Sequence, residues 1–180
     1  MRNPLLFSAL LIITCLTGIG CSKSDGSDGD GGGGGKYYVK FEIDGEKREY
    51  TGVTTLSVGQ NDGVYVYQFT GIKAPNVIEG MSMTITTDKP ITAPQSFKTV
   101  TWTPSGSTQG MIQLLLGIHD KDNTTYVSFV ATGYDYPANA TITEITSNHV
   151  KGTFNGEVTN SSFTKSKSIT KGEFFLKRMN

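Results

Sequence analysis

The hydrophobic and polar positions after residue 36 alternate with a period of two over much of the chain, which is the pattern of β-strands with one buried face. In the first run, Val39, Phe41 and Ile43 alternate with polar or charged residues. Asp44-Gly45 follows directly, and Asp-Gly between two alternating runs is a strong signal for a tight hairpin turn. Another turn is predicted at 60–63, which reads Gln-Asn-Asp-Gly. No window keeps the 3.6-residue apolar period of a helix, so we expect strands and turns.

About ten short strands are expected, with a turn every eight to twelve residues or so, as in antiparallel sandwiches and barrels. They are predicted over 37–43, 46–50, 54–58, 64–71, 78–86, 97–102, 111–118, 124–132, 141–146, 149–158 and 168–177. Flanking prolines place 97–102 at a sheet edge. The run 111–118 is apolar on both faces, so we expect it to be central and covered on both sides. The sequence predicts one all-β domain over residues 36–180, an antiparallel β-sandwich or barrel-like fold.

The first twenty residues have the features of a secretory signal peptide. Arg2 supplies a positive charge, an apolar run covers 5–16, and small residues precede Cys21. The run is shorter than the about 20 apolar residues that a membrane-spanning helix needs. We therefore expect residues 1–20 to be removed by cleavage.

Gly20-Cys21 resembles the lipobox of bacterial lipoproteins. The resemblance implies cleavage before Cys21 and attachment of acyl chains such as palmitate to this residue, and two or more chains give stable membrane anchoring. Ordinary signal-peptide cleavage, which would leave Cys21 as a free thiol, is the alternative.

Residues 22–35 contain only Ser, Lys, Asp and Gly, so we expect a disordered linker with an end-to-end distance of roughly 20 Å. Asp25, Asp28 and Asp30 resemble the acidic export signal of Bacteroidetes-type surface lipoproteins. That resemblance implies a location on the outer face of the outer membrane. A simple solvated spacer on a periplasm-facing lipoprotein is the alternative.

The C-terminal part carries a second resemblance. The segment 150–156 reads VKGTFNG and 169–174 reads ITKGEF. This pair of strands resembles the ending of many small Bacteroidetes lipoproteins of unknown function, which implies an extracytoplasmic β-sandwich-like domain and no known activity. We expect Phe154 and Val158 to meet Phe174 and Leu176 across this strand pair.

The charge balance and the cysteine content exclude several classes of function. Without Arg2, Lys23 and the three linker aspartates, 14 basic and 13 acidic residues remain, a net charge of +1. We therefore expect no nucleic-acid partner, which would require a clustered basic surface. The predicted domain lacks cysteine, so it can have neither a disulfide nor a thiolate metal site.

No pattern of catalytic residues stands out, and we expect neither an enzyme nor a bound cofactor or metal. His119 and His149 lie in separate segments without metal-ligand spacing, so we interpret both as surface residues. Asp120, Asp122 and Asn123 resemble the start of a calcium loop, but the glycine and the closing glutamate are missing, and hairpin-turn chemistry explains them better. No pair of carboxylates is singled out for glycoside hydrolysis, which makes a hydrolase the least favoured function.

Aromatic residues in predicted loops are the candidate ligand-binding residues. Trp102 lies in a Thr/Pro/Ser-rich segment, and Tyr134-Asp135-Tyr136 forms a second cluster. Exposed aromatic rings stack on sugars and also favour protein interfaces, whereas Trp102 could instead close one end of the core. The sequence predicts a non-catalytic binding module for a glycan or a protein. The alternative is a structural or assembly component of the cell envelope.

Overall fold

The computed structural model describes residues 37–73, 79–99, 113–131 and 133–179. These residues form thirteen strands and no helix, so no described segment is a helix that could cross a membrane. The strands are β1 (Tyr38–Ile43), β2 (Glu46–Tyr50), β3 (Val53–Asn61), β4 (Val64–Ile72), β5 (Gly80–Thr87), β6 (Gln95–Lys98), β7 (Gln113–His119), β8 (Thr125–Val127), β9 (Phe129–Ala131), β10 (Tyr134–Tyr136), β11 (Ala138–Ile145), β12 (His149–Asn160) and β13 (Ser166–Arg178).

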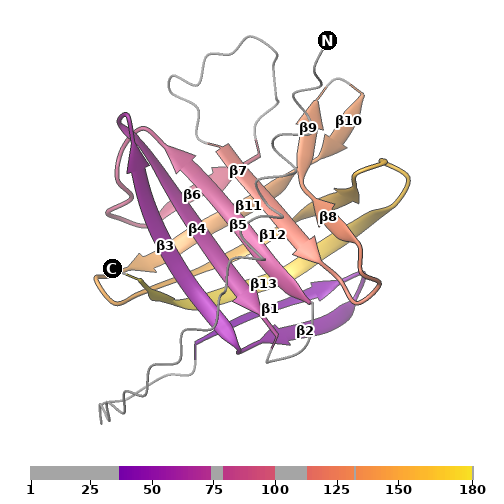
Figure 1. Cartoon of the computed structure of the whole chain (residues 1–180), viewed down its shortest axis with the longest axis horizontal. Helices are drawn as coiled ribbons and strands as arrows, with labels where there is room; N and C mark the ends of the chain where they lie inside the picture. The colour runs from indigo at the N-terminus through magenta and orange to yellow at the C-terminus, as the bar shows by residue number, and fades with distance from the viewer. Residues whose placement is uncertain (1–36, 74–78, 100–112, 132, 180) are drawn as a thin grey trace. The chain divides into compact units, whose positions relative to one another are not determined.

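Eleven strands form one sheet in the order β2-β1-β13-β3-β4-β5-β7-β8-β12-β11-β6, and β9 and β10 form a separate two-stranded sheet. Because β12 also pairs with β13, the strands from β13 to β12 form a closed ring. Figure 1 shows the resulting two layers, with β3, β4, β5 and β7 in front and β11, β12 and β13 crossing behind them. The prediction of an all-β, sandwich or barrel-like domain is confirmed.

The two longest strands close the ring because each changes its neighbour along its length. β13 pairs with β1 up to Phe175 and then with β3, in parallel, at Lys177 and Arg178. β12 pairs with β11 up to Gly156 and then with β8 at Thr159 and Asn160. Strands that switch between sheets in this way make the corners of orthogonally packed β-structures.

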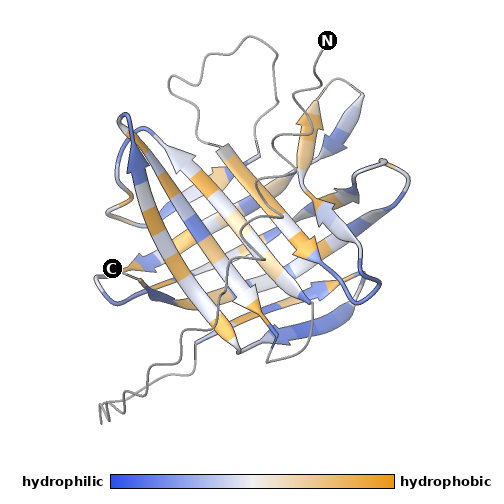
Figure 2. Ribbon diagram, viewed as in Figure 1, coloured by the Kyte–Doolittle hydropathy of each residue, from blue (hydrophilic) through white to orange (hydrophobic). Residues whose placement is uncertain are grey.

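The core lies between the layers and follows the alternation of the sequence, which appears as hydrophobic stripes along the strands in Figure 2. Phe69 from the front layer packs edge-on against Phe174 from the back layer, with ring centroids 5.3 Å apart. Phe154 lies 6.4 Å from Phe174 on the neighbouring strand, as the C-terminal pattern predicts. Burying such side chains supplies the main favourable free energy of folding.

The two tight hairpins have the turn chemistry that the sequence indicates. Asp44 and Gly45 have φ angles of 50° and 81°, and Asp62 and Gly63 have 49° and 79°. Positive φ at both central residues is the type I′ geometry that favours Asp-Gly. β3 continues to Asn61, beyond the predicted end at residue 58, because the second turn needs only these two residues.

Two expectations for the middle of the chain are wrong. The predicted strand 124–132 divides at Ser128, whose side chain accepts a hydrogen bond from the Leu116 amide at 2.9 Å. The segment 134–136, expected in a loop, forms β10 and pairs with β9.

The apolar strand β7 is covered on one face only by the described residues. Its inward residues Leu114, Leu116 and Ile118 are buried, but Leu115 on the other face stays partly exposed. Met111 lies outside the described residues. The expected short edge strand is confirmed at β6, which pairs with β11 alone.

Candidate functional site

An aromatic cluster, consisting of Phe129, Tyr134, Tyr136 and Phe163, is the candidate functional site. Phe129 comes from β9, both tyrosines come from β10, and Phe163 comes from the turn between β12 and β13. The ring centroid of Phe163 lies 4.2 Å from Tyr134, 5.7 Å from Phe129 and 6.4 Å from Tyr136. The β9–β10 hairpin and the turn between β12 and β13, which are distant in sequence, thus bring four rings together.

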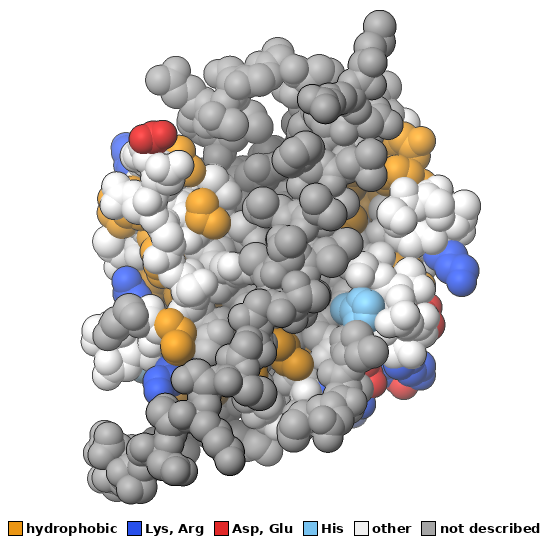
Figure 3. Space-filling model, viewed as in Figure 1, with side chains coloured by type: hydrophobic (Ala, Val, Ile, Leu, Met, Phe, Trp, Pro, Cys, Tyr) orange, Lys and Arg blue, Asp and Glu red, His pale blue; other side chains and the backbone are white. Residues whose placement is uncertain are grey.

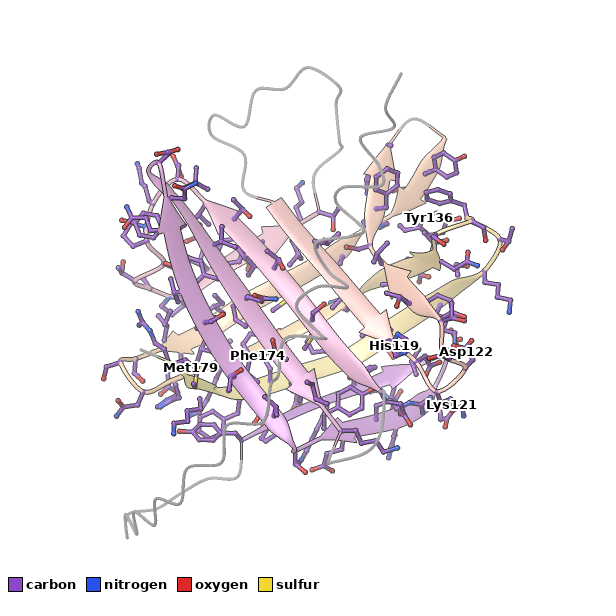
Figure 4. The ribbon with its side chains drawn as sticks, in the orientation of Figure 1. His119, Lys121, Asp122, Tyr136, Phe174 and Met179 are labelled. Carbon is purple, nitrogen blue, oxygen red and sulfur yellow. The ribbon has the colours of Figure 1, made fainter. Side chains whose placement is uncertain are left out.

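The β9–β10 hairpin positions both tyrosines. Ser128 separates β8 from β9, and Gly133, with φ of 83°, reverses the chain before β10. Tyr136 lies opposite Phe129, and Tyr134 lies opposite Ala131. Figure 4 shows Tyr136 beside the turn between β12 and β13. Residues that alternate on a strand share a face, so Tyr134 and Tyr136 point to the same side of the hairpin, while Asp135 points away.

Phe163 has a left-handed backbone, with φ of 56°, which costs a bulky side chain about 1–2 kcal/mol. Asn160 holds this conformation. Its Oδ1 accepts hydrogen bonds from the amides of Thr164 at 2.9 Å and Lys165 at 3.1 Å, and its Nδ2 donates to the Ser162 hydroxyl at 3.0 Å. The turn is therefore fixed by its own hydrogen bonds and presents the ring of Phe163 to Tyr134.

The cluster is partly open to solvent. Tyr134 is 42% exposed, and the other three rings are partly buried. Figure 3 shows hydrophobic side chains at the upper right of the view, where Figure 1 places β9 and β10. Ser161 and Ser162 are exposed beside Phe163 in sequence and offer hydroxyl groups, whereas the exposed Asp135 points to the other side of the hairpin. Such an arrangement can bind a ligand that has one apolar face and polar groups around it.

The predicted residues Tyr134, Asp135 and Tyr136 all lie on β10, and Trp102 lies outside the described residues. Sequence reasoning missed Phe129 and Phe163. Phe129 lies within the predicted strand 124–132, and Phe163 stands alone in a Ser/Thr/Lys segment. A signal for Phe163 existed in the turn-forming sequence Asn-Ser-Ser that precedes it, but its partner rings could not be assigned without the fold.

A second polar feature is a buried ion cluster formed by Arg48, Asp120 and Lys167, which come from β2, the β7–β8 turn and β13. The Arg48 Nη2 donates to Asp120 Oδ1 at 3.2 Å, and the Lys167 ammonium donates to Asp120 Oδ2. Only 2% of the Asp120 side chain is exposed. Figure 4 shows the β7–β8 turn through its labelled residues His119, Lys121 and Asp122.

The cluster holds Asp120 ionised. Burial alone would raise the pKa of Asp120, but hydrogen bonds from Lys167, the Lys121 amide and Arg48 outweigh it and lower the pKa to about 2. Glu46 binds the other side of the guanidinium at 2.7 Å. The Arg48 Nε and the buried Tyr50 hydroxyl have no hydrogen-bond partner within the described part of the chain. The cluster fastens the β1–β2 hairpin to the end of the ring of strands.

The β7–β8 turn has the hairpin chemistry that the sequence suggests. Asp122 Oδ1 accepts from the Thr124 amide at 3.0 Å, and Asn123 has a positive φ of 59°. Sequence reasoning missed the ionic role of Asp120, because its partners Arg48 and Lys167 are distant along the chain. The described residues hold no group of three or more His, Cys, Asp or Glu side chains that could bind a metal.

His149 lies in a local hydrogen-bond chain on the β11–β12 hairpin. Its Nε2 contacts Glu144 Oε1 at 2.6 Å, and its Nδ1 contacts the Thr146 hydroxyl at 3.2 Å. This order of groups resembles a nucleophile, base and acid, but the Thr146 oxygen accepts from the amides of Asn148 and His149. The Thr146 hydroxyl therefore stabilises the turn, which explains the whole arrangement without catalysis.

No family model matches this chain in comparisons with known proteins, and no curated protein or solved structure matches it either.

Proposed function

We propose that this chain is a lipid-anchored, non-catalytic surface module that binds a glycan through the aromatic cluster. The observation that carries the proposal is the convergence of Phe129, Tyr134, Tyr136 and Phe163 at a partly exposed site. An isolated exposed ring is common on proteins and needs no explanation. Four rings that a hairpin and a distant turn bring together, one of them on a strained backbone, favour a built binding surface.

The chemistry around the rings favours a sugar. The C–H faces of a pyranose ring pack on aromatic faces, while its hydroxyl groups need hydrogen-bond partners at the rim. The exposed hydroxyls of Ser161 and Ser162, in the turn that carries Phe163, supply such groups. The hydrogen bonds of Asn160 fix the turn before any ligand arrives, which lowers the entropy cost of binding.

The proposed cellular location is consistent with glycan binding. Cleavage before Cys21, acylation of that cysteine and export guided by Asp25, Asp28 and Asp30 would place the domain on the outer surface of the outer membrane. The Gly/Ser/Asp linker would hold it roughly 20 Å from the membrane and let it reorient. A glycan on or outside the cell would then be within reach.

The test of binding uses the chain after the lipobox cysteine, residues 22–180, in native gels cast with a panel of neutral and acidic polysaccharides. Tyr134→Ala and Phe163→Ala are compared with Tyr38→Ala, a matched aromatic substitution on β1 outside the cluster. We expect one polysaccharide to retard the unmodified chain and the Tyr38 variant, and both cluster variants to lose at least about tenfold in affinity, or 1.4 kcal/mol. Trp102→Ala tests the remaining predicted residue.

Three results would count against the proposal. If no polysaccharide retards the chain, the proposal of glycan binding is wrong, and cross-linking on intact cells would then look for a protein partner. Equal loss in the Tyr38 variant would place binding elsewhere. Release of reducing ends from the retarding polysaccharide would show hydrolysis and overturn the non-catalytic assignment.

Lipidation and surface location are tested separately. Palmitate labelling of expressing cells should mark the unmodified chain and not Cys21→Ala, and protease added to intact cells should digest the domain. Labelling of both chains, or of neither, would contradict acylation at Cys21. Protection from protease in intact cells, with digestion after the outer membrane is opened, would place the domain on the periplasmic side.

A further inference from the structure

The two layers of the fold differ in charge. β3, β4, β5, β7 and β8 contain no Asp, Glu, Lys or Arg at all. The strands of the other layer carry many charges, and their outward residues include Lys40, Glu49, Lys151, Glu173 and Lys177. Five of the eleven strands of the large sheet are thus uncharged in a chain with 16 basic and 16 acidic residues.

The outward residues of β3, β4, β5 and β7, which we call the neutral face, are mostly short and polar. The pairing register aligns Ser57, Gln68, Thr84 and Leu115 in one row across the four strands. The next row consists of Thr55, Thr70, Ser82 and Gly117. Thr84 and Gln68 are partly exposed and Ser57 is exposed. These four strands form the front layer in Figure 1.

Charge depletion over a continuous surface points to association. Water-facing sheet surfaces normally carry charges that keep them soluble and oppose pairing with other sheets. Protein interfaces are distinguished less by hydrophobicity than by the depletion of charged residues at their centre. The neutral face has that property across four strands, while the outer surface of the opposite layer does not.

We propose that the neutral face binds the neutral face of a second copy of this chain in a twofold dimer. A charged partner would lose hydration at its own charges and find no counter-charge here, whereas a second copy presents an equally uncharged surface. A twofold interface needs only one self-complementary surface. Short side chains such as Ser82 and Thr84 let two sheets approach to the usual spacing of about 10 Å.

The area of the neutral face sets the expected affinity of the dimer. Four strands about 4.8 Å apart, with about eight residues each rising about 3.3 Å, cover on the order of 500 Å². Stable interfaces bury about 800 Å² per partner, so this one is at the weak end. The dimer should therefore form at concentrations between about 10 μM and about 1 mM, the range of weak complexes.

The experiment is sedimentation equilibrium of residues 22–180 across that concentration range. Thr84→Lys places a charge at the centre of the face, and Thr153→Lys places the same charge on exposed β12 in the other layer. We expect the unmodified chain and Thr153→Lys to dimerise, and Thr84→Lys to remain monomeric, with at least about tenfold weaker association. Gln68→Lys gives a second central charge if Thr84→Lys does not fold, as judged by circular dichroism.

A rescue experiment locates the contact. Thr84→Glu alone should also be monomeric, and an equimolar mixture with Thr84→Lys should form heterodimers, because the opposite charges then face each other near the twofold axis. A monomer at every concentration overturns the proposal, as does a dimer that Thr84→Lys and Gln68→Lys leave intact. If the chain is monomeric and Thr84→Lys abolishes its retardation by a neutral polysaccharide, the neutral face binds a glycan and the dimer proposal is wrong. The neutral face shares no residue with the aromatic cluster, so either proposal can fail alone.

Discussion

Gly152 on β12 lies directly opposite Phe174 on β13, and a Cβ atom at position 152 would lie 2.9 Å from Cε1 of that ring. The relationship is reciprocal, because Phe154 lies opposite Gly172, whose Cβ would lie 2.7 Å from the Phe154 ring. Each Gly-x-Phe segment thus leaves room for the phenylalanine of the other. This packing gives a physical reason for the repeated Gly-x-Phe pattern in the C-terminal part of the sequence.

Gly152→Ala should therefore destabilise the domain. The added methyl group would overlap both Phe174 and the Thr141 carbonyl oxygen, and neither backbone nor core ring can move freely. We expect the free energy of unfolding to fall by about 2–3 kcal/mol, the usual cost of overpacking a core. Urea denaturation followed by circular dichroism measures it.

Gly59→Ala is the matched control for this prediction. Gly59 lies near the end of β3, and nothing lies within 4 Å of a Cβ at that position. It should change the free energy of unfolding by less than about 0.5 kcal/mol. Equal effects of the two substitutions would contradict the packing explanation.

The buried ion cluster predicts a large effect at Asp120. Asp120→Ala leaves the buried Arg48 and the largely buried Lys167 without their shared carboxylate, and removal of one partner of a buried pair costs about 3–5 kcal/mol. Glu49→Ala breaks the exposed pair with Lys40 and should cost less than about 1 kcal/mol. If thermal and urea denaturation gave similar losses for both variants, the cluster would not fasten the hairpin as described.

The same carboxylate predicts a pH dependence. Its pKa is about 2 in the folded chain against 3.8 for the free group, so the unfolded state takes up a proton first as the pH falls. The stabilisation is complete above about pH 5 and is lost progressively between about pH 5 and about pH 1, amounting to about 2 kcal/mol. Glu46, whose pKa falls to about 2 through hydrogen bonds from Arg48 and then Lys121, titrates in the same interval.

Asp120→Asn isolates the contribution of Asp120 to this pH dependence. The variant should lose less stability than the unmodified chain between pH 4 and pH 2, because the amide that replaces the carboxylate takes up no proton. Glu46 titrates in both chains and therefore does not contribute to the difference. Denaturation at a series of pH values measures the difference. Parallel stability curves for the two chains would show that Asp120 does not have a lowered pKa.

Asn160→Ala should loosen the turn that presents Phe163. The substitution removes the side-chain hydrogen bonds to Thr164, Lys165 and Ser162, and we expect a loss of about 1–2 kcal/mol in the free energy of unfolding. Retardation by the bound polysaccharide should weaken as well, because the ring of Phe163 is no longer fixed. Asn155→Ala, which removes one exposed hydrogen bond with Asn139, is the control. Unchanged binding in Asn160→Ala would show that the turn conformation is not needed for binding at the aromatic cluster.

Local patterns predicted most of the strands and both tight turns correctly. Asp44-Gly45 and Asp62-Gly63 adopt the expected turn because their preferred φ angles are properties of the residues themselves. The division at Ser128 was missed because it depends on a bond to Leu116 on another strand. For the candidate site, β10 contains the predicted tyrosines, but Phe163 joins them through a contact that no local pattern encodes.

The sequence by itself determined the alternation of buried and exposed positions, the hairpin turns and the absence of charge along β3, β4, β5 and β7, since these depend on residue type and local order. Only the tertiary structure decided which strands meet at the corners, that Arg48 reaches Asp120 across 72 residues, and that Phe163 packs on Tyr134. The physical reason is that such contacts depend on the long-range pairing of β12 and β13 with their changing neighbours, and the free energy of that closure belongs to the whole core.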